Sequence, residues 1–277
     1  MISVLAIAWL QSGLESSFDE KLYGCRPKRS TRHVLMAIIH EWQSTLDHGG
    51  VVRALLVDFK KAFDLVNHYL LLQKLLNKYV PHCLIKWLFS YLYQRSQCVR
   101  IGTDYSGWLN LNDAVPQGSG LGPLSLVLID DLDVDCLIHK YVDDTTLTEP
   151  LCVQHQPSNM ELYFQHMQVW ANNNDMVVNF NKTKEIVMGP PSKTSHLPPR
   201  QFSAGYVKCA NSVKLLGINL YADFSWKSHI EAITSKATWG LFFSETAQAC
   251  GCPPGPVASF IHRVIRPLLK YAASVWN

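Results

Sequence analysis

The sequence has no hydrophobic run long enough to cross a membrane. None of its apolar stretches reaches the roughly 18 residues that a membrane-spanning helix needs. Residues 1–10 are apolar, but they lack the positive charges that open a secretory signal, and Gln11 interrupts them. We therefore expect an intracellular protein of the nucleus or cytoplasm that is not secreted. Its first residues are expected to form a buried helix or an edge of the fold.

The spacing of the cysteines is typical neither of a disulfide framework nor of a zinc site. The eight cysteines are scattered, without a Cys-x-x-Cys pair and without the Cys/His spacing of a zinc site. Reduced and mostly buried thiols are therefore expected. The chain also lacks internal repeats and low-complexity tracts. Its net charge of +3 allows an anionic partner but does not require one.

What the chain does contain is enough apolar sequence for a sizeable core. Of its 277 residues, 48% are hydrophobic and 17% are charged, which favours one domain with lobes, or two domains. Hydrophobic periodicity predicts a mixture of helices and strands. The helices are expected at residues 31–46, 67–79, 81–93, 124–132, 159–172, 226–249 and 256–276. The strands are expected at 51–58, 97–101, 108–111, 138–142, 145–148, 212–221 and, as a pair, within 176–188.

Two adjacent carboxylates, Asp143 and Asp144, lie between two β-forming runs in the stretch Tyr141-Val142-Asp143-Asp144. This pattern predicts a hairpin that carries acid at its tip. A solvated turn is the simpler interpretation, because Asp is common in turns. However, two neighbouring negative charges repel each other, and a divalent cation would neutralise them and use their oxygens as ligands.

A third carboxylate, Asp58, follows the apolar run Val51–Val57. An acid at the end of a buried strand can lie beside a neighbouring hairpin tip. Asp58, Asp143 and Asp144 together could hold two Mg²⁺ ions roughly 4 Å apart, an arrangement used in phosphoryl transfer. The alternative is a strand-end acid or a helix cap without catalytic function. Asp64 is expected to be structural.

The motifs around these acids resemble those of reverse transcriptases from non-LTR retrotransposons, in particular the jockey-like group. The resemblance covers nearly the whole chain, and the matching segments follow one another in the order of the family. They are Tyr23-Gly24-Cys25-Arg26-Pro27-Lys28-Arg29-Ser30-Thr31, Val57–Asp64, Ala114–Pro123, Tyr141–Asp144, Asn179–Lys184, Val213–Ile218 and Arg266–Trp276.

The resemblance implies an α+β fold with a right-hand polymerase palm, in which helices pack on an antiparallel sheet, with partial fingers and a helical thumb. The expected boundaries are 1–50 for truncated fingers and the start of the palm, and 51–189 for the palm with interleaved fingers helices. Residues 190–225 are expected to form a linker and the primer-grip hairpin, and 226–277 the thumb-like region.

The resemblance also implies an activity, RNA-directed DNA polymerisation by two-metal nucleotidyl transfer to a primer 3′-hydroxyl. RNA template, DNA primer and deoxynucleoside triphosphates would be the partners, and Mg²⁺ or Mn²⁺ the cofactor. Asp58, Asp143 and Asp144 would be the catalytic metal ligands. The nucleotide-binding set would be Phe59, Phe63, Gln117, Gly118 and Lys182; the primer grip would be Leu216 and Gly217; and the template-binding set would be Arg26, Lys28, Arg29 and Arg32.

Several of these residues have simpler interpretations. Phe63, the expected steric gate against the sugar 2′-hydroxyl, could be a core aromatic residue. Lys182 and the basic run Arg26–Arg32 could belong to solvated surface.

The chain also departs from the family pattern at its start. Met1–Leu5 resembles the segment just after an Arg-Pro pair of the family's fingers, which would put the triphosphate-binding arginine before the first residue. Gly120 and Asp130 stand where a bulkier residue and an Asn are expected. An alternative function therefore remains, a truncated and catalytically inactive nucleic-acid-binding remnant of such an element. An unrelated Mg²⁺-dependent phosphoryl-transfer enzyme is disfavoured by the order of the motifs.

Overall fold

The computed structural model describes most of the chain as helices packed on one central sheet. The described residues are 8–10, 12–60, 66–111, 124, 126–151, 157–194, 197, 201–202 and 205–276. The central sheet has the strand order β11 (Lys208–Cys209), β8 (Lys184–Met188), β1 (Val51–Val57), β7 (Asp144–Leu151) and β6 (Leu137–Tyr141). Its pairs are antiparallel, except that β11 runs parallel to β8.

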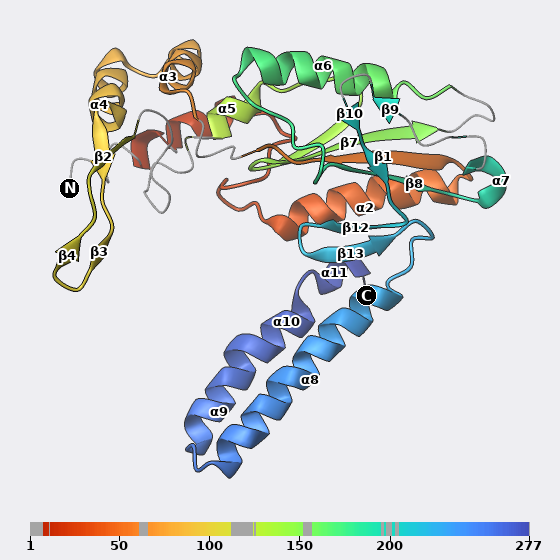
Figure 1. Ribbon diagram of the computed structural model, residues 1–277. Coiled ribbons are helices and arrows are strands. Elements are labelled where there is room, and N and C mark those ends of the chain that lie inside the picture. The colour runs from red at the N-terminus through yellow and green to blue at the C-terminus, as the bar shows by residue number, and fades with distance from the viewer. Residues whose placement is uncertain are drawn as a thin grey trace.

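Strand β1 lies in the middle of the sheet, and its alternating side chains supply both faces. Leu55 and Val57 join one core cluster, to which α6 (Met160–Asn173) contributes Phe164 and Met167. Val52 and Ala54 join a second cluster on the other face, together with residues of α2 (Thr31–Asp47). Figure 1 shows α6 along one face of the sheet and α2 along the other. Because both faces are covered, the register of β1 is fixed.

A third core cluster lies beside the sheet and holds two further helices together. These are α3 (His68–Asn77) and α4 (His82–Leu92), which pack against α5 (Leu126–Asp130) and against Leu10 and Leu14 near the start of the chain. The short helix η1 (Glu15–Ser17) connects that start to the sheet. After α4 comes a two-stranded ribbon formed by β2 (Arg95–Gln97), β3 (Arg100–Ile101), β4 (Asp104–Tyr105) and β5 (Leu109–Leu111).

The C-terminal part begins with a hairpin of β12 (Ser212–Leu215) and β13 (Ile218–Tyr221), which packs in the same cluster as α2. A long helix, α8 (Lys227–Ala249), then runs away from the sheet. The chain returns through α9 (Pro254–Phe260), a π-helical turn (Ile261–Ile265), α10 (Arg266–Lys270) and α11 (Ala273–Trp276). Figure 1 shows these helices as a projecting hairpin whose two arms lie side by side. Short elements α7 (Pro191–Thr194), β9 (Gln201–Phe202) and β10 (Gly205–Tyr206) precede β11.

The predicted elements are largely confirmed, with corrections at three places. Residues 176–188 form one strand rather than two, because 179–182 form a turn and Val178 makes only an isolated bridge to Phe59. The run 212–221 is a hairpin, since Leu216 and Gly217 both have positive φ and reverse the chain. The segment 256–276 is broken into several short helices. Within the described part of the chain, no helix has the length and apolarity to span a membrane.

Candidate active site

The two strands β6 and β7 meet in a tight hairpin whose tip is Val142 and Asp143. Tyr141 pairs with Asp144, so the turn contains only these two residues, and Asp144 begins β7. Val142 has φ of +58°, which is unusual for a β-branched residue and indicates a turn held by its surroundings. This arrangement confirms the predicted hairpin.

Gly24 is part of what surrounds that tip. A Cβ atom at position 24 would lie 2.5 Å from both the backbone nitrogen and the Cγ2 atom of Val142. Only glycine therefore allows this close approach of the two backbones. Nearby, the N–H of Tyr23 donates to the carbonyl of Lys140 at 2.8 Å, which adds residues 21–23 to the edge of β6. The N-terminal segment is thus in direct contact with the acidic turn.

Asp58 follows the last residue of β1 and is held by the turn 179–183. Its backbone N–H donates to Thr183 Oγ1 at 3.3 Å, and its carbonyl accepts from the N–H of Asn179 at 2.8 Å. On the side chain, Asn179 Nδ2 donates to Oδ2 at 2.9 Å, and Lys182 Nζ lies 3.8 Å from Oδ1. The Asp58 carboxylate is therefore positioned by polar contacts from the turn that precedes β8.

The register of the sheet brings Asp58 beside the acidic hairpin. Val57 is paired with Thr145, so the next residue along β1 is adjacent to Asp144. Partial burial raises the pKa of Asp144 to about 6, and repulsion by Asp143 and Asp58 contributes to the rise. The pKa of Asp143 is also raised, first by burial and then by the charge of Asp58. Three carboxylates that repel one another in this way form a site with a strong preference for cations.

A cavity of about 230 Å³ lies at this point and is bordered by several of the predicted residues. Its lining includes Asp58, Asp144, Lys182, Lys184, Lys214 and Leu216. The carboxylates of Asp58 and Asp144 thus share the cavity with three lysines. These come from the turn before β8 (Lys182), from β8 itself (Lys184) and from β12 (Lys214). Asp143 lies outside this lining. Among the described residues, no three His, Cys, Asp or Glu side chains converge closely enough to hold a metal in the present arrangement.

The Leu216–Gly217 turn is fixed by the C-terminal end of the chain. Leu216 has φ of +43° and Gly217 of +92°, and the hydroxyl of Tyr271 donates to the carbonyl of Leu216 at 2.6 Å. The ring of Tyr271 also packs against Gly217, where an added Cβ would lie 3.1 Å from it. The turn that was predicted as the primer grip is therefore anchored, and one edge of it reaches the cavity.

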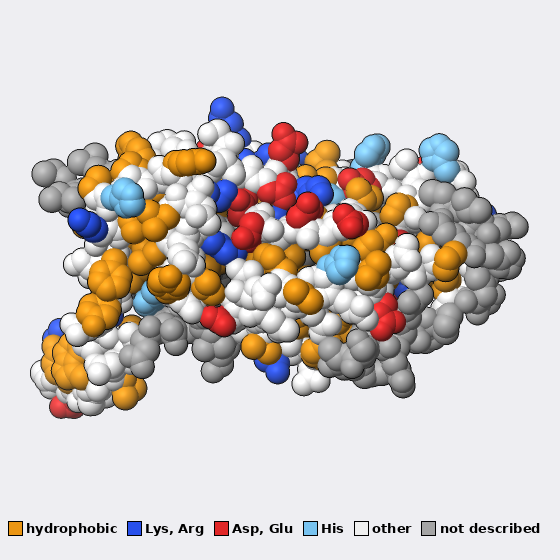
Figure 2. Space-filling model, turned by 90° about the horizontal axis from the view of Figure 1, so that it is seen from above, with side chains coloured by type: hydrophobic (Ala, Val, Ile, Leu, Met, Phe, Trp, Pro, Cys, Tyr) orange, Lys and Arg blue, Asp and Glu red, His pale blue; other side chains and the backbone are white. Residues whose placement is uncertain are grey.

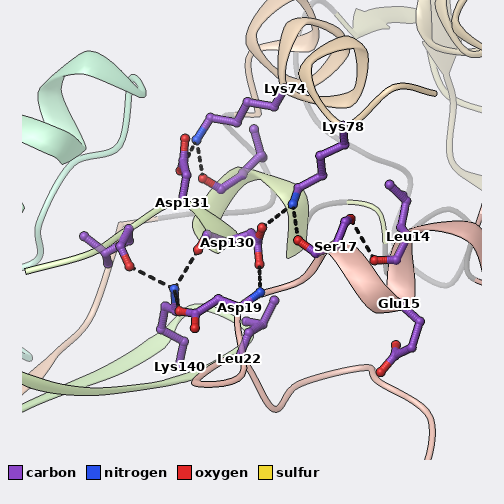
Figure 3. A network of polar contacts seen from close by, with 12 residues as sticks. Leu14, Glu15, Ser17, Asp19, Leu22, Lys74, Lys78, Asp130, Asp131 and Lys140 are labelled. Atoms are coloured by element: carbon purple, nitrogen blue, oxygen red, sulfur yellow. Dashed lines mark hydrogen bonds and ion pairs between the residues drawn. The ribbon is translucent and has the colours of Figure 1, made fainter.

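A buried polar network lies behind the acidic hairpin (Figure 3). The side chain of Lys140 is fully buried, and its Nζ is 2.6 Å from Asp19 Oδ2. The same Nζ donates to the carbonyls of Asp130 at 2.7 Å and Leu132 at 2.8 Å. The carboxylate of Asp130 accepts from the Asp19 N–H at 2.8 Å and pairs with Lys78 at 2.5 Å. The network joins the N-terminal segment, α3, α5 and β6, which leads directly to Asp143.

Acidic and basic side chains are also interspersed over the middle of the face shown in Figure 2. Two further pairs border the buried network: Lys74, which is largely buried, with Asp131 at 2.5 Å, and the exposed pair of Lys21 with Asp133 at 3.6 Å. Exposed pairs of this kind contribute little stability individually. Lys140 and Asp130 differ from them because both are buried.

The basic run 26–32 does not act as one surface. Arg26 is buried and uses its guanidinium within the protein, on Glu15 at 2.9 Å and on the carbonyls of Asp19 and Leu22. The prediction that Arg26 binds template is therefore corrected, because the side chain of Arg26 is buried and stabilises the N-terminal segment through these contacts. Arg29 donates to the carbonyls of Glu20 and Leu22 and lies over the ring of Tyr23. Lys28 and Arg32 are exposed.

Of the predicted nucleotide-binding residues, the structure describes Phe59 and Lys182. Phe59 is buried against Trp170, and the backbone bonds beside it involve the N–H of Lys60 and the carbonyl of Asp58. Lys182 has a 70% exposed side chain at the mouth of the cavity. Phe63, Gln117 and Gly118 lie outside the described residues.

Sequence reasoning missed several residues that shape the site. Asn179 and Thr183 lie inside the matched segment Asn179–Lys184 but were not singled out, and Gly24 lies inside another matched segment. Lys140 gave a usable signal, since a cation in an otherwise β-forming, apolar run requires a partner when buried. Tyr271 lies inside the matched segment Arg266–Trp276, but its contact with Leu216 depends on the return of the distant C-terminal segment, which the local sequence does not reveal.

Comparison with known proteins identifies the family. Residues 3–220 match the family of reverse transcriptases, described as RNA-dependent DNA polymerases. The chain belongs to this family.

Its relatives agree with the resemblance to non-LTR elements. The chain is 24% identical over 274 residues to the RNA-directed DNA polymerase from mobile element jockey of Drosophila melanogaster, covering 92% of this chain and 29% of that protein. It is 25% identical over 269 residues to the "Probable RNA-directed DNA polymerase from transposon X-element" of the same species, covering 93% and 29%. The chain thus spans less than a third of the length of these curated relatives. The prediction of a jockey-like reverse transcriptase is confirmed.

Solved structures support the fold. Telomerase from Candida albicans, in complex with a fragment of telomeric RNA, superposes with a TM-score of 0.53 at 12% identity, covering 98% of this chain and 48% of that one. Apo telomerase from Candida tropicalis gives a TM-score of 0.52 at 13% identity, covering 79% and 39%. The predicted right-hand polymerase fold is confirmed. Reverse transcriptases as a family work with divalent metal ions and copy RNA.

Proposed function

We propose that this chain carries out RNA-directed DNA synthesis, adding deoxynucleotides to the 3′-hydroxyl of a DNA primer. The observation that carries the proposal is the register of β1 against β7, which sets Asp58 beside Asp144 in a cavity bordered by lysines. Membership of the reverse transcriptase family indicates the class of reaction. The carboxylates and lysines around the cavity support this cavity as the place where the reaction occurs.

The residues of the site fit a pair of divalent metal ions. Carboxylate oxygens are the ligands that Mg²⁺ and Mn²⁺ prefer, and the pKa values of Asp143 and Asp144 are raised by burial and by repulsion between neighbouring carboxylates, which a bound cation would relieve. We assign Asp58 and Asp143 as the principal ligands, with Asp144 beside them. When bound, such ions lower the pKa of the primer hydroxyl and neutralise charge on the transferred phosphate and the pyrophosphate.

For the metals to bind, the Asp58 carboxylate would exchange partners. Its two oxygens are now occupied by Asn179 and by the more distant Lys182. Lys182 is largely exposed, so it is free to turn toward the triphosphate and to supply a proton to the leaving group. Asn179 would keep one oxygen fixed while the other faces the cavity.

The remaining nucleotide contacts are proposals from the sequence. The backbone N–H of Phe59 would donate to triphosphate oxygens at the end of β1. Phe63 would exclude the 2′-hydroxyl of a ribonucleotide sterically, and Gln117 and Gly118 would border the nucleotide, since glycine permits close approach and an amide both donates and accepts.

Primer and template contacts follow from the surrounding elements. The anchored turn Leu216–Gly217 would support the primer end through backbone contacts, because its position is fixed by Tyr271. Lys28, Arg29 and Arg32 would contact template phosphates, as exposed or half-exposed cations on one segment.

Primer extension tests this function. Extension of oligo(dT) annealed to poly(rA) in the presence of Mg²⁺ is compared for the wild-type chain, Asp143→Asn and Asp47→Asn, a matched control whose exposed carboxylate lies at the end of α2. We expect extension by the wild type and by Asp47→Asn, and at least a hundredfold loss with Asp143→Asn. Equal extension by all three proteins would overturn the assignment. The absence of extension by any of them would favour the inactive remnant instead.

A further inference from the structure

A ribbon of residues 95–111 follows α4 and carries several large apolar side chains that are exposed. It consists of the paired strands β2–β5 and β3–β4 and projects from the helices beside the sheet (Figure 1). Its large exposed side chains are Val99 (64%), Ile101 (76%), Tyr105 (59%), Trp108 (68%) and Leu109 (68%). A two-stranded ribbon gains little stability by itself, and a contiguous apolar surface of this kind usually has a binding partner.

The aromatic rings of this region are combined with cations. The guanidinium of Arg95 lies 4.6 Å from the ring centroid of Tyr91, and that of Arg100 lies 5.4 Å from that of Tyr105. On α4, the rings of Phe89 and Tyr93 are stacked at 5.0 Å, and both residues are at least half exposed. Between residues 80 and 111 the basic residues are Lys86, Arg95 and Arg100, and Asp104 is the single acid. The surface therefore has a net positive charge.

A pocket of about 420 Å³ lies where the ribbon leaves α4. Tyr93, Gln94, Arg95 and Asn110 are among its lining residues. Gln94 has φ of +51°, an uncommon conformation for a residue other than glycine that often marks a functional position. The amides of Gln94 and Asn110 can both donate and accept hydrogen bonds, as the edges of a nucleobase require. The ring of Tyr93 beside them offers a stacking surface.

We propose that the ribbon and the pocket at its base bind single-stranded RNA, namely the unpaired part of the template. Single strands are recognised by exposed aromatic rings that stack on bases and by cations that follow the phosphates. The pairing of rings with guanidinium groups, the positive charge and the amide-lined pocket match this chemistry. A protein partner would also cover the exposed apolar side chains, but it would not account for the guanidinium groups of Arg95 and Arg100 beside the aromatic rings.

Figure 1 shows the ribbon and the helical hairpin α8–α10 projecting toward the same side of the central sheet. The proposal rests on the proposed polymerase function for the identity of the strand, but its binding chemistry can be measured without any catalysis.

Binding measurements on the full chain test the proposal. Fluorescence anisotropy is recorded with two primer–templates that share one duplex and carry unpaired 5′ template RNA of about 2 or about 12 nucleotides, the longer one matching the usual length of single-strand sites. The wild type should bind the longer overhang more tightly. Trp108→Ala and Tyr105→Ala should each weaken binding to the longer overhang about tenfold, as expected for loss of one stacked base, with little change for the shorter one.

Two further variants make the test specific. Tyr79→Ala removes an aromatic residue that is 93% exposed but lies away from the ribbon, and it should bind both overhangs as the wild type does. Arg100→Ala should reduce the salt dependence of binding to the longer overhang by about 0.7 in log–log slope, the value for one phosphate of a single strand.

The outcomes separate this proposal from the proposed function. Extension of the short-overhang template reports catalysis alone and should be unchanged in the ribbon variants. Equal affinity of wild type, Trp108→Ala and Tyr105→Ala for the longer overhang would overturn the ribbon as an RNA site, whatever the catalytic result. So would a wild-type dimer in sedimentation that Trp108→Ala converts to a monomer, because the ribbon would then be covered by a second copy.

Discussion

The carboxylate of Asp19 lies 2.6 Å from the fully buried ammonium of Lys140, and this pair connects the N-terminal segment to the strand that leads to Asp143. The ammonium also donates hydrogen bonds to two backbone carbonyls, so its donors are satisfied within the protein. A buried charge with such partners fixes one arrangement of the elements around it, although it need not increase stability over an apolar core.

Replacement of Lys140 by Met should lower the free energy of unfolding by about 3–5 kcal/mol. The reason is that Asp19 would remain as a partly buried charge without its partner. Urea unfolding at neutral pH measures the change. Lys28→Met, at an exposed position, is the matched control and should stay within about 0.5 kcal/mol of the wild type. If Lys140→Met were as stable as Lys28→Met, the network would have no structural importance.

Gly24→Ala should reduce the rate of nucleotide addition with only a modest loss of stability. The new Cβ would overlap Val142 at the tip of the acidic hairpin, and either the tip or the segment 23–25 must move. Gly255→Ala is the control, because an added Cβ there meets nothing within 4 Å. Single-turnover incorporation should fall at least tenfold in Gly24→Ala relative to Gly255→Ala. Identical rates would show that the close contact has no influence on the hairpin.

Tyr271→Phe should weaken the hold on the primer end. The substitution removes the hydroxyl that donates to the Leu216 carbonyl at 2.6 Å and keeps the ring against Gly217. The loss of one hydrogen bond of this kind corresponds to about 1 kcal/mol. We expect an increased KM for primer–template and a nearly unchanged kcat. A fall in kcat at constant KM would instead implicate Tyr271 in the chemical step.

The pH dependence of stability should contain a contribution from His139. Burial lowers the pKa of His139 to about 4, and the ammonium of Lys21 lowers it further in the same direction. The unfolded chain takes up this proton near pH 6.5, whereas the folded chain does so only near pH 4. The stability contribution is therefore complete above pH 6.5 and is lost as the pH falls toward 4.

His139→Gln removes this titration and provides the comparison. Between pH 7 and pH 5 the free energy of unfolding should fall by about 2 kcal/mol more in the wild type than in the variant. This amount follows because pH 5 lies about 1.5 units below the pKa of the histidine in the unfolded chain. The carboxylate of Glu41 lies 3.6 Å from His139 Nε2, and burial raises its pKa, so it contributes with the opposite sign; Glu41→Gln in both proteins removes it from the difference. Equal pH profiles for the two proteins would contradict a buried neutral His139.

The sequence was sufficient for most of the fold because its signals are local. The apolar run before Asp58 and the β-forming runs on both sides of Asp143 and Asp144 predicted strands that the structure contains. Their side-by-side arrangement followed from the expectation of a shared metal site, and the register of β1 against β7 agrees with it. The prediction failed where long-range contacts decide: of the two strands expected on either side of 179–183, only β8 forms, and Val178 makes only an isolated bridge to Phe59.

The same limit applies to the basic segment. Composition alone does not distinguish Arg26, which is buried against Glu15, from Lys28, which is exposed. That difference arises from how residues 15–22 fold back onto the edge of β6, and no local pattern encodes it. The Lys140 network depends in the same way on Asp19 and on Lys78 at the end of α3, both of which are far from Lys140 in the chain.

The central claim is that Asp58, Asp143 and Asp144 act together as a divalent metal site in this chain. Electron paramagnetic resonance of free Mn²⁺ measures it directly, in the presence of dTTP and a primer–template whose primer lacks the 3′-hydroxyl, so that no reaction occurs. The wild-type complex and the Asp47→Asn complex should each bind about two Mn²⁺ ions per chain, and Asp58→Asn should bind fewer, with at least tenfold weaker affinity. Equal Mn²⁺ binding by the wild type and Asp58→Asn would contradict the account.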